Sequence, residues 1–397
     1  MKPHVLLVGG KDSAFASIAE LGVRVTLLQK RADLTQRQVD CAARLVLTET
    51  INDTHARAVA RAVHAVDPFH AVVSFSEACL SLTACIGEQL GVPHNPRPAV
   101  ERSRNKVAMR ALLAERGLPS ARYRACWRQA DVEAFRAEVG TIILKPSSGS
   151  GSRGVTYIDS PGDVEPGWEW CTAGGALPAI AEEFLTGREY SVESLTVDGA
   201  HQVLMVTEKL TSGPPAFVET GHQMPARLPA HVRDEVARIV LALLDALGHR
   251  WGPAHTEVMI RAAGRPAIIE TQTRFGGDQI WEMTQHVTGV PLAGATVAAL
   301  VGLPDPSAAP AHKGAAIRFF APQNAVIGEV TGADAARAVP GVERVNIRAK
   351  PGTKLGRLRD SWSRQGYVLA YGPDTDTAIA GAEAAAALLN FDLKPLL

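Results

Sequence analysis

Two apolar runs on either side of a tight turn constrain the fold of this chain more than any other feature. They lie within His255–Gly277 and flank a breaker at Ala262–Pro266, a pattern that predicts two antiparallel strands. Counting through the turn places Glu257 opposite Glu270. Like charges that face each other across an antiparallel pair are destabilising, so a nearby positive charge must offset the two carboxylates.

Three polar side chains at the end of the second run favour a divalent metal as that offset. Successive side chains of a strand point to opposite faces, so Glu270, Gln272 and Arg274 share one face. Carboxylate and amide oxygens are ligands of hard cations, and a guanidinium further along the strand holds an anion. The segment therefore predicts a site for metal-bound phosphate. A solvent-facing strand with scattered charges is the simpler interpretation of the same residues.

Charge and length limit the class of protein. The 397 residues carry 41 basic and 41 acidic side chains, so the formal net charge is +0. Nothing in this balance favours nucleic acid or an anionic membrane as a partner. With 46% hydrophobic residues the composition is that of an ordinary globular protein, and a chain of this length is expected to form two or three domains.

The cysteines and the N-terminal segment indicate a cytoplasmic protein. The five cysteines are scattered and form no Cys-x-x-Cys pair, which favours reduced, buried thiols over a disulfide framework or a zinc site. The apolar run Val5–Val8 is too short for a signal-peptide core and is typical of a first strand. No run of about 18 apolar residues occurs, so a membrane span is not expected.

Residues 1–95 alternate between short apolar runs and amphipathic stretches. The expected strands are Val5–Val8, Val23–Leu28, Ala42–Val46 and Ala71–Phe75, and the expected helices are Ser13–Leu21, Asp53–Val66 and Glu77–Leu90. This order predicts a parallel sheet with helices on both faces. The Gly9-Gly10 turn lacks the G-x-G-x-x-G spacing of dinucleotide-binding folds, which argues against a nicotinamide dehydrogenase.

A loop of small residues follows a strand that ends at Lys145. The loop, Ser147–Gly154, returns to a second strand instead of opening a helix, so it is not a P-loop. Its glycines let backbone N–H groups approach phosphate oxygens, and its serines supply hydroxyls. We therefore expect a phosphate-binding loop with Lys145 at its base. A flexible hairpin loop is the simpler alternative.

Taken together, these segments resemble the ATP-grasp superfamily of carboxylate–amine ligases over about residues 1–300. The resemblance implies that Glu182–Leu185 contacts adenine, with Glu182 or Glu183 receiving its exocyclic amine, and that Glu189 holds the ribose. A solvated strand edge is the alternative for these acidic residues. The implied nucleotide-binding residues are Lys106, Lys145, Ser148, Gly149, Ser150, Gly151, Ser152, Gly154, Glu182, Glu183, Phe184, Leu185 and Glu189.

The same resemblance assigns the metal site. Glu257 and Glu270 match the family's metal-bridging carboxylates. Gln272 stands where the family usually has asparagine, so the amide oxygen is kept but a methylene is added. Arg274 looks like the arginine that binds phosphate and carboxylate. The implied cofactors are ATP and two Mg²⁺ ions, with Mn²⁺ as a substitute.

A further segment narrows the subgroup. Phe217–Ala226 is similar to the Glu-x-Gly-His-x-x-Pro-Ala loop of the amino-acid ligases that form dipeptides, of the bacilysin-synthetase type. By this resemblance Glu219 and His222 face the amine or the acyl phosphate, and with Arg274 they are the candidate catalytic residues. A turn histidine packed on Met224 is the alternative for His222.

The resemblance also implies an architecture. We expect an α/β protein, in part α+β, with the ATP-grasp fold: a Rossmann-like preATP-grasp domain at 1–95, an ATP-grasp domain at 96–310 with a mobile lid at about 120–185, and a C-terminal α/β module at 311–397. Strands are expected at Gly314–Phe320, Val326–Thr331, Gly341–Ile347 and Tyr367–Tyr371, and a helix at Asp376–Leu389. The module carries no catalytic motif, and Arg318 either reaches the site or is structural.

The implied activity is ATP-dependent ligation. A carboxylate, expected to be that of an amino acid, becomes an acyl phosphate and is joined to an amine, with ADP and phosphate as products. Formate or bicarbonate ligation of the purine-synthesis type and a non-catalytic nucleotide-binding module are the alternatives. Family analogy places such an enzyme in the synthesis of a peptide natural product. The frequency of twofold oligomers favours a homodimer.

Overall fold

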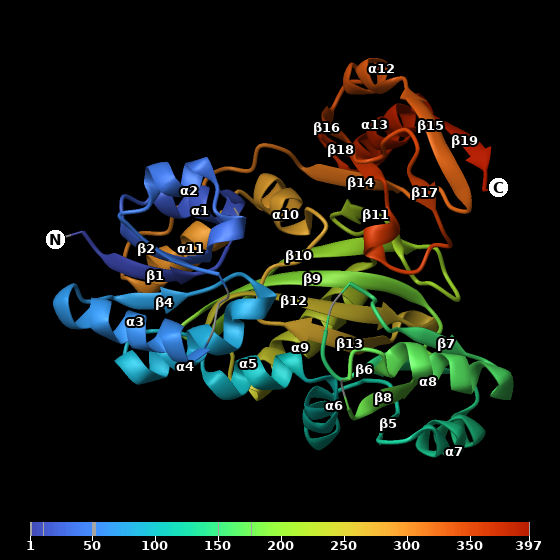
Figure 1. Ribbon diagram of the computed structural model, residues 1–397, viewed down its shortest axis with the longest axis horizontal. Coiled ribbons are helices and arrows are strands. Elements are labelled where there is room, and N and C mark those ends of the chain that lie inside the picture. The colour runs from blue at the N-terminus through green and yellow to red at the C-terminus, as the bar shows by residue number, and fades with distance from the viewer. Residues whose placement is uncertain (1, 11, 50–52, 150, 176, 397) are drawn as a thin grey trace.

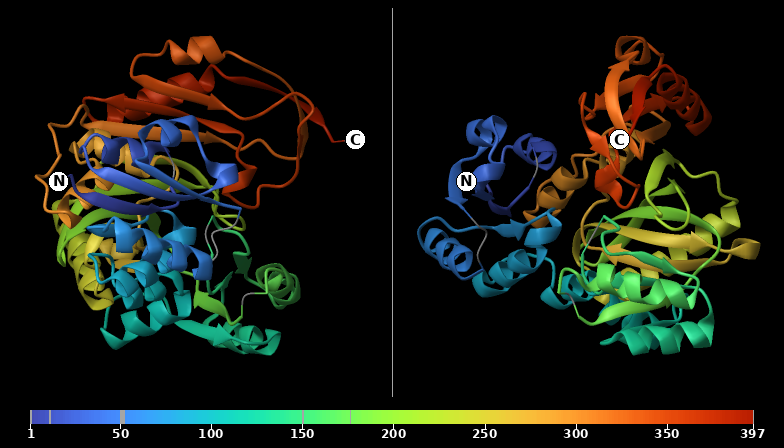
Figure 2. Two further views of the ribbon diagram at one scale, coloured as in Figure 1. Left: turned by 60° about the vertical axis from the view of Figure 1, so that its left-hand side comes forward. Right: turned by 45° about the vertical axis from the view of Figure 1, so that its right-hand side comes forward.

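The structure is a computed structural model that describes residues 2–10, 12–49, 53–149, 151–175 and 177–396. In the described part of the chain the strands form four sheets, of four, eight, three and four strands. The eight-stranded sheet is the centre of the molecule, and the N-terminal part, the lid and the C-terminal module surround it (Figures 1 and 2). The α/β fold class predicted from the sequence is confirmed.

The N-terminal part is the predicted parallel sheet with helices on both faces. Its strand order is β3-β2-β1-β4, and all three pairings are parallel. The elements are β1 (His4–Val8), α1 (Asp12–Ala19), β2 (Arg24–Lys30), α2 (Gln36–Cys41), β3 (Arg44–Thr48), α3 (Asp53–Val66), β4 (Ala71–Val73) and α4 (Leu80–Leu90). The predicted helix at 77–90 begins instead with a 3-10 turn, η2 (Glu77–Cys79). This turn places Glu77 directly beyond the carboxyl end of β4.

The central sheet runs in the order β13-β12-β9-β10-β11-β14-β18-β16. All its pairings are antiparallel. Its first strands are β9 (Arg188–Val197), β10 (Ala200–Thr211), β11 (Glu219–Met224), β12 (Trp251–Ile260) and β13 (Pro266–Gln272). Helix α9 (Ala230–Leu247) packs its buried face, including Ile239, Leu243 and Leu244, into one core with these strands. On the opposite face, helix α10 (Ile280–Thr288) packs Ile280 and Met283 against Met205 and Met224, and polar side chains such as Lys209 and Glu257 lie beside this cluster.

Further helices connect the N-terminal part to the central sheet. They are α5 (Arg97–Arg104), α6 (Lys106–Glu115), α10 (Ile280–Thr288) and α11 (Leu292–Leu300). The Asn105 side chain caps helix α6 by accepting hydrogen bonds from the N–H groups of Val107 and Ala108. This cap places Lys106 in the first turn of the helix.

The lid is a small layer of sheet and helix at residues 120–185. Its strand order is β5-β8-β6-β7. The elements are β5 (Tyr123–Cys126), α7 (Gln129–Val139), β6 (Ile142–Pro146), β7 (Thr156–Ile158), α8 (Val164–Thr172) and β8 (Ala179–Glu183). The antiparallel pair β6 and β7 encloses the glycine-rich loop, so the predicted strand–loop–strand is confirmed.

The C-terminal module extends the central sheet. Strand β14 (Gly314–Phe320) pairs with β11 and with β18 (Gly366–Gly372), and β16 (Val342–Ile347) closes that edge. The remaining elements are β15 (Ala325–Thr331), α12 (Ala333–Arg337), β17 (Lys354–Leu355), η5 (Ser361–Ser363), α13 (Thr375–Ala387) and β19 (Asn390–Pro395). Strand β19, which pairs with β15, was not predicted, because most of its side chains are exposed and it has no apolar face.

Among the described residues, no helix is both long and apolar enough to cross a membrane.

Candidate active site

The two glutamates of the strand pair face each other as predicted. Strands β12 and β13 are antiparallel and joined by a turn at Ala262–Gly264, and their register pairs Glu257 with Glu270. A register shift follows directly after Glu257. Both carboxylates are partly exposed on the polar face of the central sheet, where a ligand can reach them.

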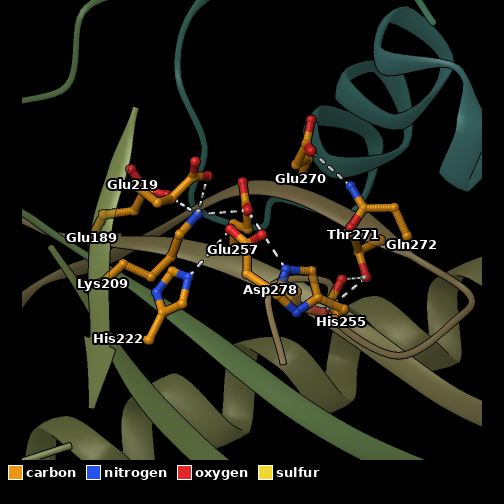
Figure 3. Close-up of polar contacts among 12 residues, drawn as sticks. Glu189, Lys209, Glu219, His222, His255, Glu257, Glu270, Thr271, Gln272 and Asp278 are labelled. Carbon is orange, nitrogen blue, oxygen red and sulfur yellow. Dashed lines mark hydrogen bonds and ion pairs between the residues drawn. The ribbon is translucent and has the colours of Figure 1, made fainter. Parts of the chain in front are cut away.

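A lysine that the sequence analysis missed offsets the charge of Glu257. The Nζ atom of Lys209, on β10, lies 2.7 Å from Oε1 of Glu257 and 3.6 Å from Oε1 of Glu219, and it forms an ion pair with Glu189. Its side chain is only 3% exposed. Burial lowers the pKa of an ammonium, but the three carboxylates outweigh burial and hold the pKa of Lys209 well above its usual value. Figure 3 shows this ammonium at the centre of the cluster.

Glu189 therefore contacts a cation in the structure. The sequence predicted a ribose contact for this residue, and the described carboxylate points toward Lys209 (Figure 3). Burial, with Glu257 and Glu219 nearby, raises the pKa of Glu189 even though Lys209 opposes the shift. Glu189 and Glu257 thus share one ammonium, and the candidate ribose and metal residues lie side by side.

A second cation, His255, lies on the other side of Glu257. Its Nδ1 atom is 2.6 Å from Oε1 of Glu193, and its Nε2 atom is 3.5 Å from Oε1 of Glu257. Burial lowers the pKa of the imidazole, but the two glutamates outweigh burial and raise it to about 9. His255 and Lys209 together hold the pKa of Glu257 well below its usual value despite its burial. Glu257 is therefore ionised and ready to bind a cation.

Lys106 and Gln272 surround the second glutamate, Glu270. The Nζ atom of Lys106 lies 3.5 Å from Oε2 of Glu270 and donates to the carbonyl of Gly149 at 3.2 Å. The Nε2 atom of Gln272 donates to Oε1 of Glu270 at 2.7 Å. The amide nitrogen of Gln272, and not its oxygen, thus faces Glu270. The predicted metal contact requires this amide to turn by about 180°.

Lys145 is buried in an ion-pair network at the base of the glycine-rich loop. Its Nζ atom lies 2.6 Å from Oε2 of Glu182, whose Oε1 atom lies 2.7 Å from Nε of Arg110. Arg110 also donates to the carbonyls of Ile268 and Ile269 on β13, at 3.2 and 2.6 Å. Burial raises the pKa of Glu182, but Arg110 and Lys145 outweigh it and lower the pKa. This network joins the lid to the strand that carries Glu270.

The rest of the predicted adenine segment lies at the end of β8. Glu183 is paired with Arg122 at 2.7 Å. The ring of Phe184 meets Tyr157 edge-on at 5.2 Å and lies 5.8 Å from Phe217. Leu185 follows and is half-buried. The segment therefore combines an apolar aromatic surface with the backbone N–H and C=O groups that follow the end of β8. It lies next to the glycine-rich loop.

The glycine-rich loop has the backbone that its composition predicts. Gly149, Gly151, Ser152 and Gly154 all have positive φ, and Ser148 is exposed. A Cβ atom at Gly154 would lie 2.8 Å from Cγ of Pro146, so only glycine fits there. The predicted phosphate ligand Ser150 lies outside the described residues.

Arg274 lies beyond the end of β13 and contacts the N-terminal part. Its Nε atom donates to Oε2 of Glu77 at 3.0 Å, and its Nη1 atom donates to the carbonyl of Phe275 at 2.8 Å. Arg104 donates to the other oxygen of Glu77 at 2.9 Å. A cavity of about 240 Å³ adjoins this group, lined by Glu77, Ser81, Glu101, Arg104, Asn105, Ser148 and Gly149. The cavity therefore lies between the N-terminal part and the glycine-rich loop.

Glu219 and His222 lie on β11, next to Lys209. The register pairs Lys209 with His222. The imidazole of His222 is 1% exposed, and neither ring nitrogen has a hydrogen-bond partner among the described residues. Its Nε2 atom lies 3.5 Å from Oδ2 of Asp278, and its ring meets Phe319 edge-on at 5.6 Å. The alternative of a turn histidine is wrong, because His222 lies inside a strand.

Arg318 contacts residues outside this cluster. Its Nη2 atom donates to Oε1 of Gln223 and to Oε1 of Glu383, both at 2.9 Å. These contacts join β14 to β11 and α13. They favour the structural role for Arg318.

Three family models match successive parts of the chain. An ATP-grasp N-terminal domain matches residues 15–94, an ATP-grasp domain matches residues 139–282, and an L-amino acid ligase C-terminal domain 2 matches residues 318–394. Their order along the chain is that of the N-terminal sheet, the lid with the central strands, and the C-terminal module. The three matches together show an ATP-grasp ligase.

Named relatives of this ATP-grasp ligase have more than one activity. The formate-dependent phosphoribosylglycinamide formyltransferase of Geobacter metallireducens is 29% identical over 96% of this chain and 95% of its own length. The alanine–anticapsin ligase of Bacillus subtilis is 27% identical, over 55% of this chain and 51% of its own. The crystal structure of an L-amino acid ligase from Bacillus licheniformis superposes with a TM-score of 0.81 at 22% identity, covering 98% of both chains. This superposition shows a shared fold.

The residues of this ATP-grasp ligase fit a nucleotide-bound magnesium ion. Among the described residues, no group of three or more His, Cys, Asp or Glu side chains is arranged to hold a metal by itself. The pair Glu257 and Glu270 offers two carboxylates on a partly exposed face. Mg²⁺ takes one or two protein carboxylates and completes its shell with phosphate oxygens and water. A two-carboxylate site next to the glycine-rich loop meets this requirement.

Some of the missed residues carry a signal that pattern reading can detect. Glu208 and Lys209 are adjacent charges inside a mainly apolar strand, and a buried charge needs a partner. Glu77 follows a parallel strand at its carboxyl end, where α/β sheets bind ligands. Asp278 and Arg364 carry no such signal, because their pairing joins two distant loops.

Proposed function

We propose that this ATP-grasp ligase activates the carboxylate of an amino acid as an acyl phosphate and joins it to the amino group of a second amino acid. ADP and phosphate are the other products. One observation carries the proposal: Lys209 contacts both Glu257 and Glu219. The candidate metal–phosphate site and the candidate amine site thus share one ammonium, so an acyl phosphate formed at the first is within reach of an amine at the second.

Basic side chains would stabilise the transferring phosphoryl group. Lys106 lies beside Glu270, Lys209 beside Glu257 and Lys145 at the base of the glycine-rich loop, and Arg274 follows the end of β13. Positive charge that is fixed before the reaction lowers the energy of a transition state in which negative charge spreads over phosphate oxygens. Mg²⁺ would be held by Glu257 and Glu270. The amide oxygen of Gln272 would join them once the amide turns. A bound Mg²⁺ neutralises phosphate charge.

The nucleotide base would lie against the end of β8. Glu182 is already paired with Arg110 and Lys145, so we assign the adenine contacts to the backbone of Glu183–Leu185. The aromatic group around Phe184 supplies an apolar surface for the ring. The lid at about 120–185 would close over the phosphates and keep water away from the acyl phosphate.

The surroundings of Arg274 favour an amino acid as the acid substrate. Its guanidinium matches a carboxylate, and the adjoining carboxylate of Glu77 matches an ammonium group. Glu77 lines the cavity beside the glycine-rich loop. A molecule that carries a carboxylate and an ammonium on neighbouring atoms would satisfy both residues, whereas formate would satisfy only the arginine.

Glu219 and His222 would receive the amine. The nitrogen lone pair attacks the acyl carbon, the bond from that carbon to the phosphate oxygen breaks, and phosphate leaves. The amine must lose a proton, and the buried imidazole of His222, whose ring nitrogens have no hydrogen-bond partner within the described part of the chain, is a suitable acceptor. Glu219 lies beside Lys209 and would orient the incoming nitrogen.

The test is ATP turnover with purified protein, Mg²⁺ and a matrix of single and paired amino acids. We expect phosphate and ADP to appear only with particular pairs, together with a dipeptide detected by mass. The Glu270→Gln variant is the control for contaminating ATPases and should form neither product. Absence of amino-acid-dependent turnover would refute the proposal.

Formate ligation is the second candidate, because the formyltransferase relative aligns over nearly the whole chain. The same assay separates the two. Phosphate release that depends on formate, and not on amino acids, would favour the second candidate.

A further inference from the structure

One turn of the C-terminal module reaches the candidate amine site. The turn, Asp360–Arg364, includes η5 (Ser361–Ser363) and precedes β18. Arg364 donates two hydrogen bonds to Asp278, at 2.7 and 2.6 Å. Its guanidinium carbon lies 3.9 Å from the centre of the Phe319 ring. The hydroxyl of Ser361 donates to Oε2 of Glu219 at 2.8 Å. The turn therefore contacts an amine-site residue directly.

Arg364 and His222 approach the same oxygen of Asp278. The Oδ2 atom of Asp278 accepts from Nη1 of Arg364 at 2.7 Å and lies 3.5 Å from Nε2 of His222. The shorter contact is a normal hydrogen bond, and the longer one is too long for a strong bond. The guanidinium fork thus holds the carboxylate in place, just short of the imidazole. The Arg364 side chain is only 5% exposed and that of Asp278 is 27% exposed, so the guanidinium side of this contact is shielded from water.

Charge balance supports the same arrangement. Burial raises the pKa of the Asp278 carboxyl, but the nearby imidazole of His222 and the guanidinium of Arg364 outweigh burial and lower the pKa far below its usual value. Asp278 is therefore an anion. Without Arg364, the remaining polar partner of Asp278 in this contact set would be the imidazole of His222. The free carboxylate of Asp278 would then rotate toward His222 and bind its ring nitrogen. That nitrogen is the one to which we assign the proton of the incoming amine.

The opposite side of the turn faces the lid. A Cβ atom added to Gly151 would lie 3.5 Å from Nε1 of Trp362. Arg359, just before the turn, lies 5.7 Å from the ring centre of Trp170 on α8 of the lid. The turn thus lies between the glycine-rich loop and the amine site. It borders the space where the reaction would take place.

We propose that Arg364 is a positioning residue of the amine half-reaction, which keeps Asp278 away from His222 so that the imidazole stays available to the incoming amine. The inference rests on the proposed function. It assigns a role in catalysis to the C-terminal module, in which the sequence showed no catalytic motif. It also predicts that the role is confined to the amine, since Arg364 contacts neither Glu257 nor Glu270 among the described residues.

A second arginine offers a matched control. Arg344 also belongs to the C-terminal module and also makes a bidentate pair, with Glu282 of α10, at 3.1 and 2.6 Å. This pair joins the same two parts of the protein but does not contact His222, Glu219 or Asp278. A variant Arg344→Met therefore loses a similar interdomain ion pair without disturbing the amine site.

The experiment compares two fates of the acyl phosphate. Hydroxylamine traps it as a hydroxamate without the amine site, whereas amide formation requires that site. In Arg364→Met we expect the KM for the amine to rise about tenfold to a hundredfold. We expect the hydroxamate rate and the KM values for ATP and the acid to stay within about twofold. Arg344→Met should keep wild-type values for both products. Arg364→Lys keeps the positive charge but loses the bidentate geometry of the guanidinium, so its amine KM should rise less. This variant replaces Arg364→Met in the experiment if the methionine variant does not fold.

A double-mutant cycle gives an independent readout. Asp278→Asn removes the carboxylate that would bind the imidazole, so it should raise the amine KM less than Arg364→Met does. The double variant should resemble Asp278→Asn, because Arg364→Met acts only through that carboxylate. A wild-type amine KM in folded Arg364→Met, or an equal loss of hydroxamate and amide, overturns the inference while leaving the proposed function intact. If wild-type protein forms neither product with any amino acid, the proposed function fails and the inference fails with it.

Discussion

Replacing Lys209 by methionine removes the one ammonium that Glu189, Glu219 and Glu257 share. Two of these carboxylates contact Nζ directly and the third lies 3.6 Å away, and the lysine side chain is almost fully buried. Methionine keeps the length of the side chain and its packing. The variant therefore tests the charge and little else.

The expected loss of stability is large. Removing one partner of a buried ion pair costs about 3–5 kcal/mol, because an uncompensated charge is left behind. In a domain of this size 1 kcal/mol corresponds to about 2–4 °C, so we expect Tm to fall by roughly 6–20 °C at pH 8 without Mg²⁺. Differential scanning fluorimetry and urea denaturation measure the change.

The loss of stability should depend on pH in the variant. The raised pKa of Lys209 means that its contribution in the wild type is complete below the ordinary lysine pKa and is lost only at higher pH. It is therefore constant between pH 5 and 8. In Lys209→Met the unpaired glutamates bind protons as pH falls, so the difference from wild type should shrink at pH 5. Mg²⁺ with ADP should also reduce it, because the metal replaces the missing cation.

An exposed lysine gives the control. Lys394 is 67% exposed and lies 3.8 Å from Asp392, so Lys394→Met should change the free energy of unfolding by less than about 1 kcal/mol. If Lys209→Met is also within about 1 kcal/mol of wild type at pH 8, the assumption that the cluster needs this charge is wrong.

Three further predictions follow from the same site. Glu270→Gln should lower the rate of ADP formation by at least about a hundredfold, because a metal carboxylate is lost, while Tm stays near that of the wild type; normal turnover would refute the metal assignment. Arg110→Met should destabilise the protein by about 3–5 kcal/mol and raise the KM for ATP more than that for the acid, since Arg110 joins Glu182 to β13; equal effects on both KM values would contradict this link. His255→Gln should lower stability most at pH 6. The pKa of His255 is raised to about 9, so the stabilisation by its ion pair is complete below the ordinary value of 6.5 and is lost as pH rises through 9. A stability difference from wild type that is the same at pH 6 and pH 9.5 would disprove the ion pair with Glu193.

Local patterns predicted much of the fold. The register of Glu257 and Glu270 follows from the period of a strand and the length of one turn, both of which involve neighbouring residues. The parallel N-terminal sheet follows from alternating strands and helices. Helix α3 begins and ends where its amphipathic pattern does. The predicted helix at 77–90 begins with a 3-10 turn that the prediction did not include, because a single turn at Glu77–Cys79 is too short to have a periodic pattern of its own.

The roles of single residues in the site were harder to predict. The Lys209–Glu257 contact joins residues 48 positions apart, and the Arg364–Asp278 contact joins residues 86 positions apart. Neither pairing follows from a periodicity or a motif. Glu182 and Glu189 were predicted as nucleotide contacts from their place in the sequence, yet in the structure each is paired with a buried basic residue.

The sequence by itself determined the parallel N-terminal sheet, the two facing glutamates and the glycine-rich loop, because strand period, turn chemistry and loop composition act between neighbours in the chain. The ATP-grasp architecture was expected from the resemblance of these segments to that family. Only the tertiary structure decided which cations neutralise those glutamates and that a turn of the C-terminal module reaches His222 through Asp278. Buried charges must be paired, but the choice of partner depends on which strands and loops the fold brings together.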